Sequence, residues 1–211
     1  MKKYSFIALI LASLLFSSSS LFAQKGVAKL NLEWNAGLPL GNFKNNYISN
    51  GSLRGFTGDV TVGLNNQWAL GLGFGTQDFY QKYPMATYDL APNQQVSAVV
   101  TNSIQIMPLL FKAMYTPFQG STHLIQPYAT IGAGIAFVNY NQYLGEFSSN
   151  NTPKGHFSAM ADGGIMIPFN KYNSNTAFQL GASFQYVHFN QPDAMALNTA
   201  NIHAGFIFRL R

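Results

Sequence analysis

Eight stretches of this sequence alternate apolar residues with small or polar ones, and this period of two constrains the fold more than any other feature. Between residues 67 and 76, for example, Leu70 and Leu72 fall on one face of an extended chain, whereas Gly71 and Gly73 fall on the other. Alternation over such a length predicts a strand whose two faces meet different surroundings. The eight segments are residues 29–38, 54–64, 67–76, 103–115, 124–138, 157–169, 176–188 and 202–211. We therefore expect an all-β fold.

The two faces of these segments distinguish a membrane barrel from a soluble β-sandwich. Charged residues make up only 9% of the chain, against about 25% in soluble domains. A soluble sandwich exposes its non-core faces to water and carries many Lys and Glu there, whereas the second face here holds mainly Gly, Asn, Ser, Thr and Gln. The first face is nearly free of polar atoms. This combination predicts an eight-stranded antiparallel up-and-down transmembrane β-barrel. A barrel is expected because lipid cannot form hydrogen bonds with the backbone groups at an open sheet edge.

The connections between the segments indicate an orientation. Long connections are expected over residues 39–53, 77–102, 139–156 and 189–201, and they alternate with short ones over residues 65–66, 116–123 and 170–175. Outer-membrane barrels have short periplasmic turns and longer extracellular loops, and an even strand number returns both termini to the periplasm. We therefore expect the long connections at the cell surface.

Residues 1–23 have the features of a cleavable signal peptide. Two lysines precede an apolar stretch over residues 6–16, which is too short to span a bilayer comfortably, and Ala23 supplies a small residue before the expected cleavage point. The chain has no cysteine, which excludes lipoprotein anchoring and a disulfide framework. We expect one barrel domain over residues 24–211, in the outer membrane of a Gram-negative bacterium.

Two short motifs resemble strands of known outer-membrane barrels. Residues 104–112 read IQIMPLLFK and resemble the I-x-I-P-L-L-x-K strand common in outer-membrane β-barrel domain proteins of Bacteroidota, with Met107 inserted before the proline. Residues 127–134 read PYATIGAG and resemble the P-Y-x-x-x-G-x-G strand of the same group and of small OmpA-, OmpX- and OmpW-like barrels. The last six residues, FIFRLR, depart from the common pattern of a final aromatic residue. The resemblance covers the layout of the mature chain and implies membrane placement and insertion by the barrel assembly machinery, but no activity, because the group is functionally mixed.

A few ionisable residues fall on the second, inward face of the expected strands. A charge in a narrow barrel must be paired or solvated, so we expect these side chains to form an internal network that fills the lumen. A proton or ion path and a ligand site at the outer mouth are the alternatives. The expected members are Glu33, Asp59, Lys112, Asp162, His203 and Arg209.

The sequence offers little for catalysis or for cofactors. His156 and Ser158 faintly resemble the catalytic pair of outer-membrane lipid A deacylases, but the alternation turns both inward and no carboxylate stands where it would orient the histidine. No phosphate-binding glycine loop and no metal-spaced His or Cys cluster occurs. The net charge of +5 forms no basic stripe, which excludes nucleic acid as a partner. We expect no enzymatic activity, no catalytic residues, no cofactor and no metal.

The longest expected connection, residues 77–102, concentrates aromatic side chains. Phe79, Tyr80, Tyr83 and Tyr88 are expected to contact a protein partner, a glycan or lipopolysaccharide. The leading function is a non-enzymatic barrel that acts in envelope integrity or surface interaction through its extracellular loops. The alternatives are a narrow OmpW-like channel for small or apolar molecules, a lipid A-modifying enzyme, and a barrel component of a secretion or gliding complex. Outer-membrane lipids and lipopolysaccharide are the expected surroundings.

Overall fold

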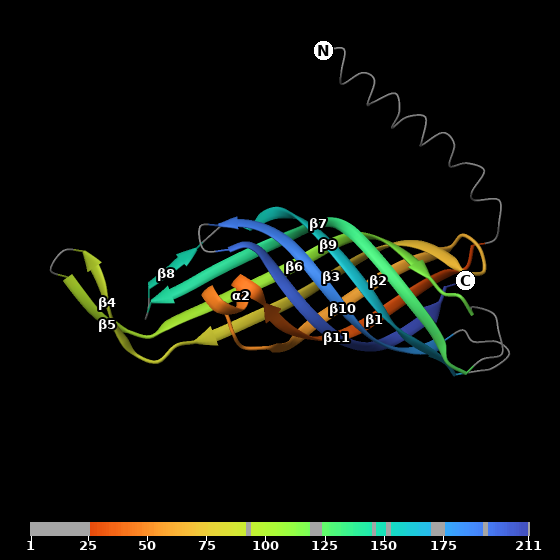
Figure 1. The fold of residues 1–211 in the computed structure, drawn as a ribbon, viewed down its shortest axis with the longest axis horizontal. Coiled ribbons are helices and arrows are strands. Elements are labelled where there is room, and N and C mark those ends of the chain that lie inside the picture. The colour runs from red at the N-terminus through yellow and green to blue at the C-terminus, as the bar shows by residue number, and fades with distance from the viewer. Residues whose placement is uncertain are drawn as a thin grey trace, which may run out of the picture.

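Eight long strands form a closed antiparallel barrel (Figure 1). The structure, a computed structural model, describes residues 26–91, 94–118, 124–144, 147–150, 153–169, 176–191 and 194–210. The barrel strands are β1 (Ala28–Leu40), β2 (Ser52–Gly63), β3 (Trp68–Lys82), β6 (Val100–Tyr115), β7 (Gln126–Leu144), β9 (Lys154–Pro168), β10 (Thr176–Gln191) and β11 (Ala194–Arg209). Each pairs with its neighbour along the chain, and β11 pairs with β1, so that no barrel strand has an open edge. The expected eight-stranded up-and-down barrel is confirmed, whereas the expected signal peptide lies outside the described residues.

Four short elements lie toward one end of the barrel. Strands β4 (Ala86–Ala91) and β5 (Gln94–Ala98) form a separate hairpin, β8 (Phe147–Asn150) pairs with the end of β7, and helix α2 (Gly41–Asn46) follows β1. In Figure 1 they lie on the side away from the C-terminus. We call this side the loop end, and the side where β1 begins and β11 ends the terminal end.

The expected extent of the long connections is wrong. Strands β3 and β6 continue their pairing up to Lys82 and Thr101, and the β10–β11 ladder continues to Gln191 and Ala194. Much of residues 77–102 and 189–201, like most of 139–156, is therefore strand. The alternation of apolar residues fades there because the outer face of the sheet carries polar residues such as Asp78, whereas the backbone hydrogen bonds continue regardless of side-chain polarity.

The cross-strand register turns the apolar face outward and the polar face inward. Leu72 and Ile131 are 58% and 66% exposed on the outer surface, whereas Asp59 and Lys112 are 5% and 6% exposed inside the barrel. This is the facing that the alternation predicts, and a shift of one residue would reverse it. The outer wall is a belt of exposed Leu, Ile, Val and Phe to which all eight barrel strands contribute, whereas soluble monomers rarely expose a large contiguous apolar surface.

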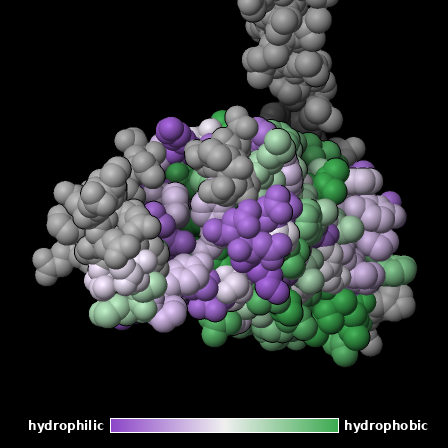
Figure 2. All heavy atoms as spheres, turned by 60° about the vertical axis from the view of Figure 1, so that its left-hand side comes forward, coloured by the Kyte–Doolittle hydropathy of each residue, from purple (hydrophilic) through white to green (hydrophobic). Residues whose placement is uncertain are grey.

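The two margins of this belt differ. At the terminal end the rings of Trp68 and Tyr115 lie 4.8 Å apart on adjacent strands, as is typical of an interfacial aromatic girdle. Toward the loop end the outer face turns polar at Asp78 and Gln105. Figure 2, in which the loop end comes forward, shows hydrophilic residues gathered on that end and hydrophobic ones on the wall behind it.

Among the described residues, no helix is both long enough and apolar enough to cross a membrane.

Apolar side chains fill the loop-end part of the lumen. Helix α2 and the residues after it fold into the barrel mouth, where Phe43 and Ile48 are completely buried. The Phe43 ring packs edge-on against Phe79, with ring centroids 5.2 Å apart. Tyr47 packs in the same way against Tyr140 of β7, at 5.4 Å. We call this group the apolar cluster; its buried members are Phe43, Tyr47, Ile48, Phe79, Ile104, Ile106, Ala136, Val138, Val187, Phe189 and Leu197.

Candidate functional site in the barrel lumen

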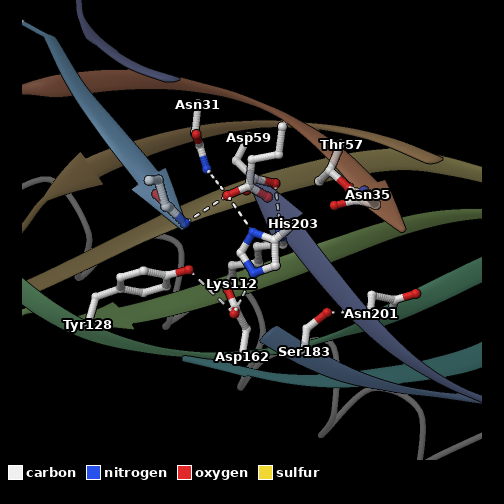
Figure 3. A network of polar contacts seen from close by, with 12 residues as sticks. Asn31, Asn35, Thr57, Asp59, Lys112, Tyr128, Asp162, Ser183, Asn201 and His203 are labelled. Atoms are coloured by element: carbon white, nitrogen blue, oxygen red, sulfur yellow. Dashed lines mark hydrogen bonds and ion pairs between the residues drawn. The ribbon is translucent and has the colours of Figure 1, made fainter. Parts of the chain in front are cut away.

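Five inward-facing ionisable side chains from five strands meet in the middle of the barrel (Figure 3). We call them the polar cluster: Glu33 of β1, Asp59 of β2, Lys112 of β6, Asp162 of β9 and His203 of β11. All five side chains are less than one tenth exposed. A barrel can bring them together although they lie far apart in the sequence, because alternation directs each of them to the same axis.

Lys112 and Asp59 form the shortest contact of the polar cluster. The Lys112 Nζ atom donates a hydrogen bond to Asp59 Oδ1 at 2.6 Å, and both side chains are 7% exposed. A buried ammonium group is tolerated only when an opposite charge compensates its lost hydration. Each of these two residues therefore depends on the other.

His203 lies between the two other carboxylates. Its Nε2 atom is 2.9 Å from Asp162 Oδ1, and its Nδ1 atom is 3.2 Å from Glu33 Oε1, an ion-pair distance without hydrogen-bond alignment. In a neutral imidazole one ring nitrogen carries a lone pair instead of a proton. That lone pair would face a carboxylate here, so the arrangement fits the imidazolium form. Together with Lys112, two cationic groups then face three carboxylates.

Amide and hydroxyl groups supply further donors to these carboxylates. Asn31 Nδ2 and Gln179 Nε2 each donate to Glu33 Oε1 at 2.7 Å. The Tyr128 hydroxyl lies 3.5 Å from Asp162 Oδ1, which is a long contact. The alternation places these three residues on the inner face, but it gives no sign that they would serve the charged residues. Sequence reasoning missed them for that reason.

Two glycines leave the space that the polar cluster occupies. A Cβ atom on Gly73 would lie 2.2 Å from Asp59 Oδ1 and 2.6 Å from Lys112 Cε. A Cβ atom on Gly181 would lie 2.3 Å from the Tyr128 hydroxyl and 2.7 Å from His203 Nε2. All four distances are shorter than van der Waals contact, so these glycines are required for close approach rather than for an unusual backbone conformation.

Little open space remains around the polar cluster. A cavity of about 40 Å³ lies beside it, and amide and hydroxyl side chains such as Asn35, Thr57 and Gln185 line part of its wall. This volume holds at most a few water molecules. Tyr128, Met166 and Ile207 form a small apolar group in the part of the lumen toward the terminal end. In the described part of the chain, buried side chains therefore occupy the lumen at three levels: the small apolar group toward the terminal end, the polar cluster, and the apolar cluster at the loop end.

The structure brings five of the six expected network residues together and leaves Arg209 apart. Arg209 lies at the terminal end of β11, opposite Lys29 of β1 in the register, and it is exposed. Alternation puts it on the inner face, as expected. At the last residue of a strand, however, the inner face opens to water, which removes the need for a buried partner.

The expected loop contact residues lie in different surroundings. Phe79 is completely buried in the apolar cluster, so its assignment to a contact surface is wrong: it belongs to β3 and points into the barrel. Tyr83 donates a hydrogen bond to the backbone oxygen of Tyr47 at 2.9 Å, which helps to hold the segment after α2. Tyr80 is 47% exposed. The side chain of Tyr88 lies outside the described residues.

The faint catalytic pattern at the rim has no catalytic geometry. The Ser158 hydroxyl is fully buried and accepts a hydrogen bond from Gln185 Nε2 at 3.3 Å. The ring of His156 packs against Phe189, with ring centroids 5.5 Å apart. No group of three or more His, Cys, Asp or Glu side chains suited to a metal occurs within the described ranges.

Comparison with solved structures finds outer-membrane and surface proteins with a similar fold. The outer membrane protein OprG from Pseudomonas aeruginosa aligns with a TM-score of 0.50 and 12% sequence identity, covering 88% of this chain and 96% of that one. Neisserial surface protein A gives 0.47 and 10%, covering 89% and 98%. Ail of Yersinia pestis, solved with the heparin analogue sucrose octasulfate, gives 0.46 and 12%, covering 88% and 97%. At such identities the likeness concerns the fold alone. No family model matches the chain, and the search of curated proteins found no match.

Proposed function

We propose that this protein is a non-enzymatic outer-membrane barrel of the Bacteroidota type that acts at the cell surface through its loop end. The single observation that carries the proposal is the filled lumen. The polar cluster closes the middle of the barrel and the apolar cluster closes its mouth. Because buried side chains occupy the lumen at both levels among the described residues, we expect interaction to use the part of the barrel beyond the apolar belt.

The exposed apolar belt supports membrane placement. Residues such as Leu72, Ile131 and Ile202 are more than half exposed on the outer wall, and lipid is the surrounding in which such a surface is stable. In the closed ring of strands, no barrel strand has an edge whose backbone groups would lack hydrogen-bond partners in lipid. Outer-membrane lipids, lipopolysaccharide and the barrel assembly machinery are then the general partners of the chain.

The loop end offers features suited to surface interaction. Tyr80, Met85 and Met195 are exposed there, beyond the margin at which the outer face turns polar. Aromatic and Met side chains supply adaptable apolar contact area. By contrast, the connection at Asn65 and Asn66 on the terminal side is a tight turn. Long extensions at one end and short turns at the other correspond to extracellular and periplasmic ends in outer-membrane barrels.

The filled lumen can be tested in planar bilayers and in liposome swelling assays. We expect purified wild-type barrel to give no stable conductance and no swelling with small sugars. A variant in which Phe43 and Ile48 are both replaced by Gly opens only the mouth and is expected to stay closed, because the polar cluster remains. Stable wild-type conductance, or uptake of small apolar molecules by reconstituted vesicles, would favour the narrow-channel alternative instead.

The surface role can be tested by site-specific photo-crosslinking on intact cells. A crosslinking amino acid at Met85 or Met195 is expected to give adducts with envelope or surface components, and a tag at residues 92–93 is expected to be labelled from outside. The same amino acid at Asn66, the matched control, should give neither result before lysis. Adducts at Asn66 alone would reverse the orientation. A change in lipid A mass on deletion of the gene would favour the enzyme alternative.

A further inference from the structure

The cavity beside the polar cluster is lined largely by side chains that carry oxygen atoms. Its volume is about 40 Å³, which is enough for one small ion with one or two water molecules. Glu33 and Asp162 of the polar cluster belong to its wall, together with four buried amide side chains. Figure 3 shows two of these amides, Asn35 and Asn201, on the same side of His203. The four amides, each 7–9% exposed, are Asn35, Gln77, Gln185 and Asn201.

The four amides are all held by their nitrogen atoms. Each amide nitrogen donates a hydrogen bond to a neighbouring hydroxyl or backbone oxygen, whereas the amide oxygen accepts none from the described residues. A buried carbonyl oxygen without a donor has lost its hydration without compensation. These oxygens therefore point to a ligand that is cationic or donates hydrogen bonds. The four bonds are Asn35 Nδ2 to Thr57 Oγ1, Gln77 Nε2 to the Ser52 backbone oxygen, Gln185 Nε2 to Ser158 Oγ and Asn201 Nδ2 to Ser183 Oγ.

The polar cluster carries more negative than positive charge. Its three carboxylates face Lys112 and the His203 imidazolium, which leaves one negative charge. With a neutral imidazole the excess would be two. Among the described residues, no other Lys, Arg or His lines the cavity. A buried excess of charge requires compensation by a counter-ion or a proton, so the charge balance supplies a second, independent reason to expect a cation here.

We propose that this cavity binds one monovalent metal cation, Na⁺ or K⁺, through amide and carboxylate oxygens. Oxygen ligands suit hard cations, whereas transition metals favour imidazole and thiolate, and carbonyl oxygens coordinate Na⁺ in membrane transporters. One monovalent ion neutralises the single excess charge of the polar cluster, and a divalent ion would reverse it. A water molecule donates hydrogen bonds to the amide oxygens but leaves the excess charge in place. The ion thus accounts for both observations.

The test is urea titration of the refolded barrel in neutral detergent micelles, with NaCl or KCl exchanged for choline chloride at constant ionic strength. Choline is too large for a cavity of about 40 Å³, so it keeps the screening equal without occupying the site. An ion that binds only the folded barrel stabilises it by mass action. Above the dissociation constant, each tenfold rise in Na⁺ or K⁺ should raise the ratio of folded to unfolded barrel tenfold, or about 1.4 kcal/mol.

Two variants at Gln185 locate the ion in this cavity. Gln185→Lys supplies an ammonium group from the chain, and we expect the stability of this variant to be independent of Na⁺ and K⁺. The matched control is Gln67→Lys, the same substitution at an exposed residue just before β3, which should keep the wild-type dependence. Gln185→Met removes one amide oxygen at similar volume and should require about tenfold more cation for the same stabilisation. The wild-type titration decides the inference even where the lysine variant does not refold.

Equal stability of the wild-type barrel in sodium, potassium and choline chloride would overturn the inference. If the pH dependence of unfolding then shows one extra proton bound in the folded state, a protonated carboxylate supplies the missing charge and the cavity holds water alone. Stabilisation by Ca²⁺ or Mg²⁺, but not by Na⁺ or K⁺, would contradict the charge count. A wild-type response to Na⁺ in refolded Gln185→Lys would place the ion outside this cavity and would also overturn the inference.

Discussion

The polar cluster and the apolar cluster fill the same barrel by opposite means. In the polar cluster, five charged side chains depend on individual distances, such as 2.6 Å between Lys112 and Asp59. In the apolar cluster, eleven buried side chains depend on shared volume, and edge-on rings such as Phe43 and Phe79 can adjust to one another. A polar filling specifies one arrangement and fails when a single partner is removed. An apolar filling loses stability in proportion to the volume removed.

The largest effect is expected from breaking the ion pair of the polar cluster. Lys112→Met keeps most of the side-chain volume but leaves the buried Asp59 carboxylate without its cation, which costs about 3–5 kcal/mol of unfolding free energy. Urea titration of refolded barrels in lipid vesicles measures this value. The double variant with Asp59→Asn removes the orphaned charge and should recover more than half of the loss. If the double variant is as unstable as the single one, the loss of stability does not come from the uncompensated Asp59 carboxylate, and the Lys112–Asp59 ion pair is not what stabilises this region.

The apolar cluster is expected to respond to volume rather than to chemistry. Phe43→Ala leaves a cavity at the barrel mouth and should cost about 3 kcal/mol, the lower end of the range for buried aromatic residues, because the α2 segment can partly collapse into the space. Phe43→Leu keeps most of the volume and should cost less than about 1.5 kcal/mol. The same urea titrations apply. If both variants are equally unstable, the apolar cluster depends on the specific side chain and not on volume, and it does not differ from the polar cluster in this respect.

A smaller effect is expected from crowding the polar cluster. Gly73→Ala forces a methyl group to within 2.2 Å of Asp59 Oδ1, which should cost about 1–3 kcal/mol as the ion pair shifts. Gly163→Ala is the matched control, since its methyl group points to the open outer face and meets no atom closer than 3.6 Å. Its unfolding midpoint in urea should match or slightly exceed that of the wild type. Equal losses for both would mean that strand flexibility, not space for the ion pair, explains the inner glycine.

The barrel and the facing of its side chains could be predicted from the sequence because both follow from a local signal. The period of two within each strand predicts that Leu72 faces outward and Asp59 inward, whatever lies elsewhere in the chain. Membership of the polar cluster was predictable for the same reason, since a charge on the inner face must find a partner. Which charges pair could not be predicted, because the pairing depends on how the strands are staggered around the barrel.

The apolar cluster could not be predicted, and the cause is physical. Phe43 and Ile48 lie in a segment with no alternation of apolar and polar residues. Their burial depends on tertiary packing, because the segment folds back into the barrel mouth. The sequence predicts a loop at Phe79 because the outer face of β3 turns polar next to it, at Asp78. The backbone hydrogen bonds that keep Phe79 in the barrel do not depend on side-chain polarity, so the polarity pattern does not predict them.

The smallest effect is expected at Arg209, and it separates position on the inner face from membership of the polar cluster. Arg209 shares the inner face of β11 with His203, but it lies at the strand end and is exposed to water. Arg209→Gln should therefore change the unfolding free energy by no more than about 0.5 kcal/mol, as is usual for exposed sites. His203→Gln, on the same face of the same strand, removes the imidazole between Glu33 and Asp162. The two buried carboxylates then repel each other with no cation between them. We expect its loss to exceed that of Arg209→Gln severalfold in the same urea titration. If the two variants lose equal stability, the inner charges act as one long network that reaches the terminal end, and Arg209 belongs to the polar cluster.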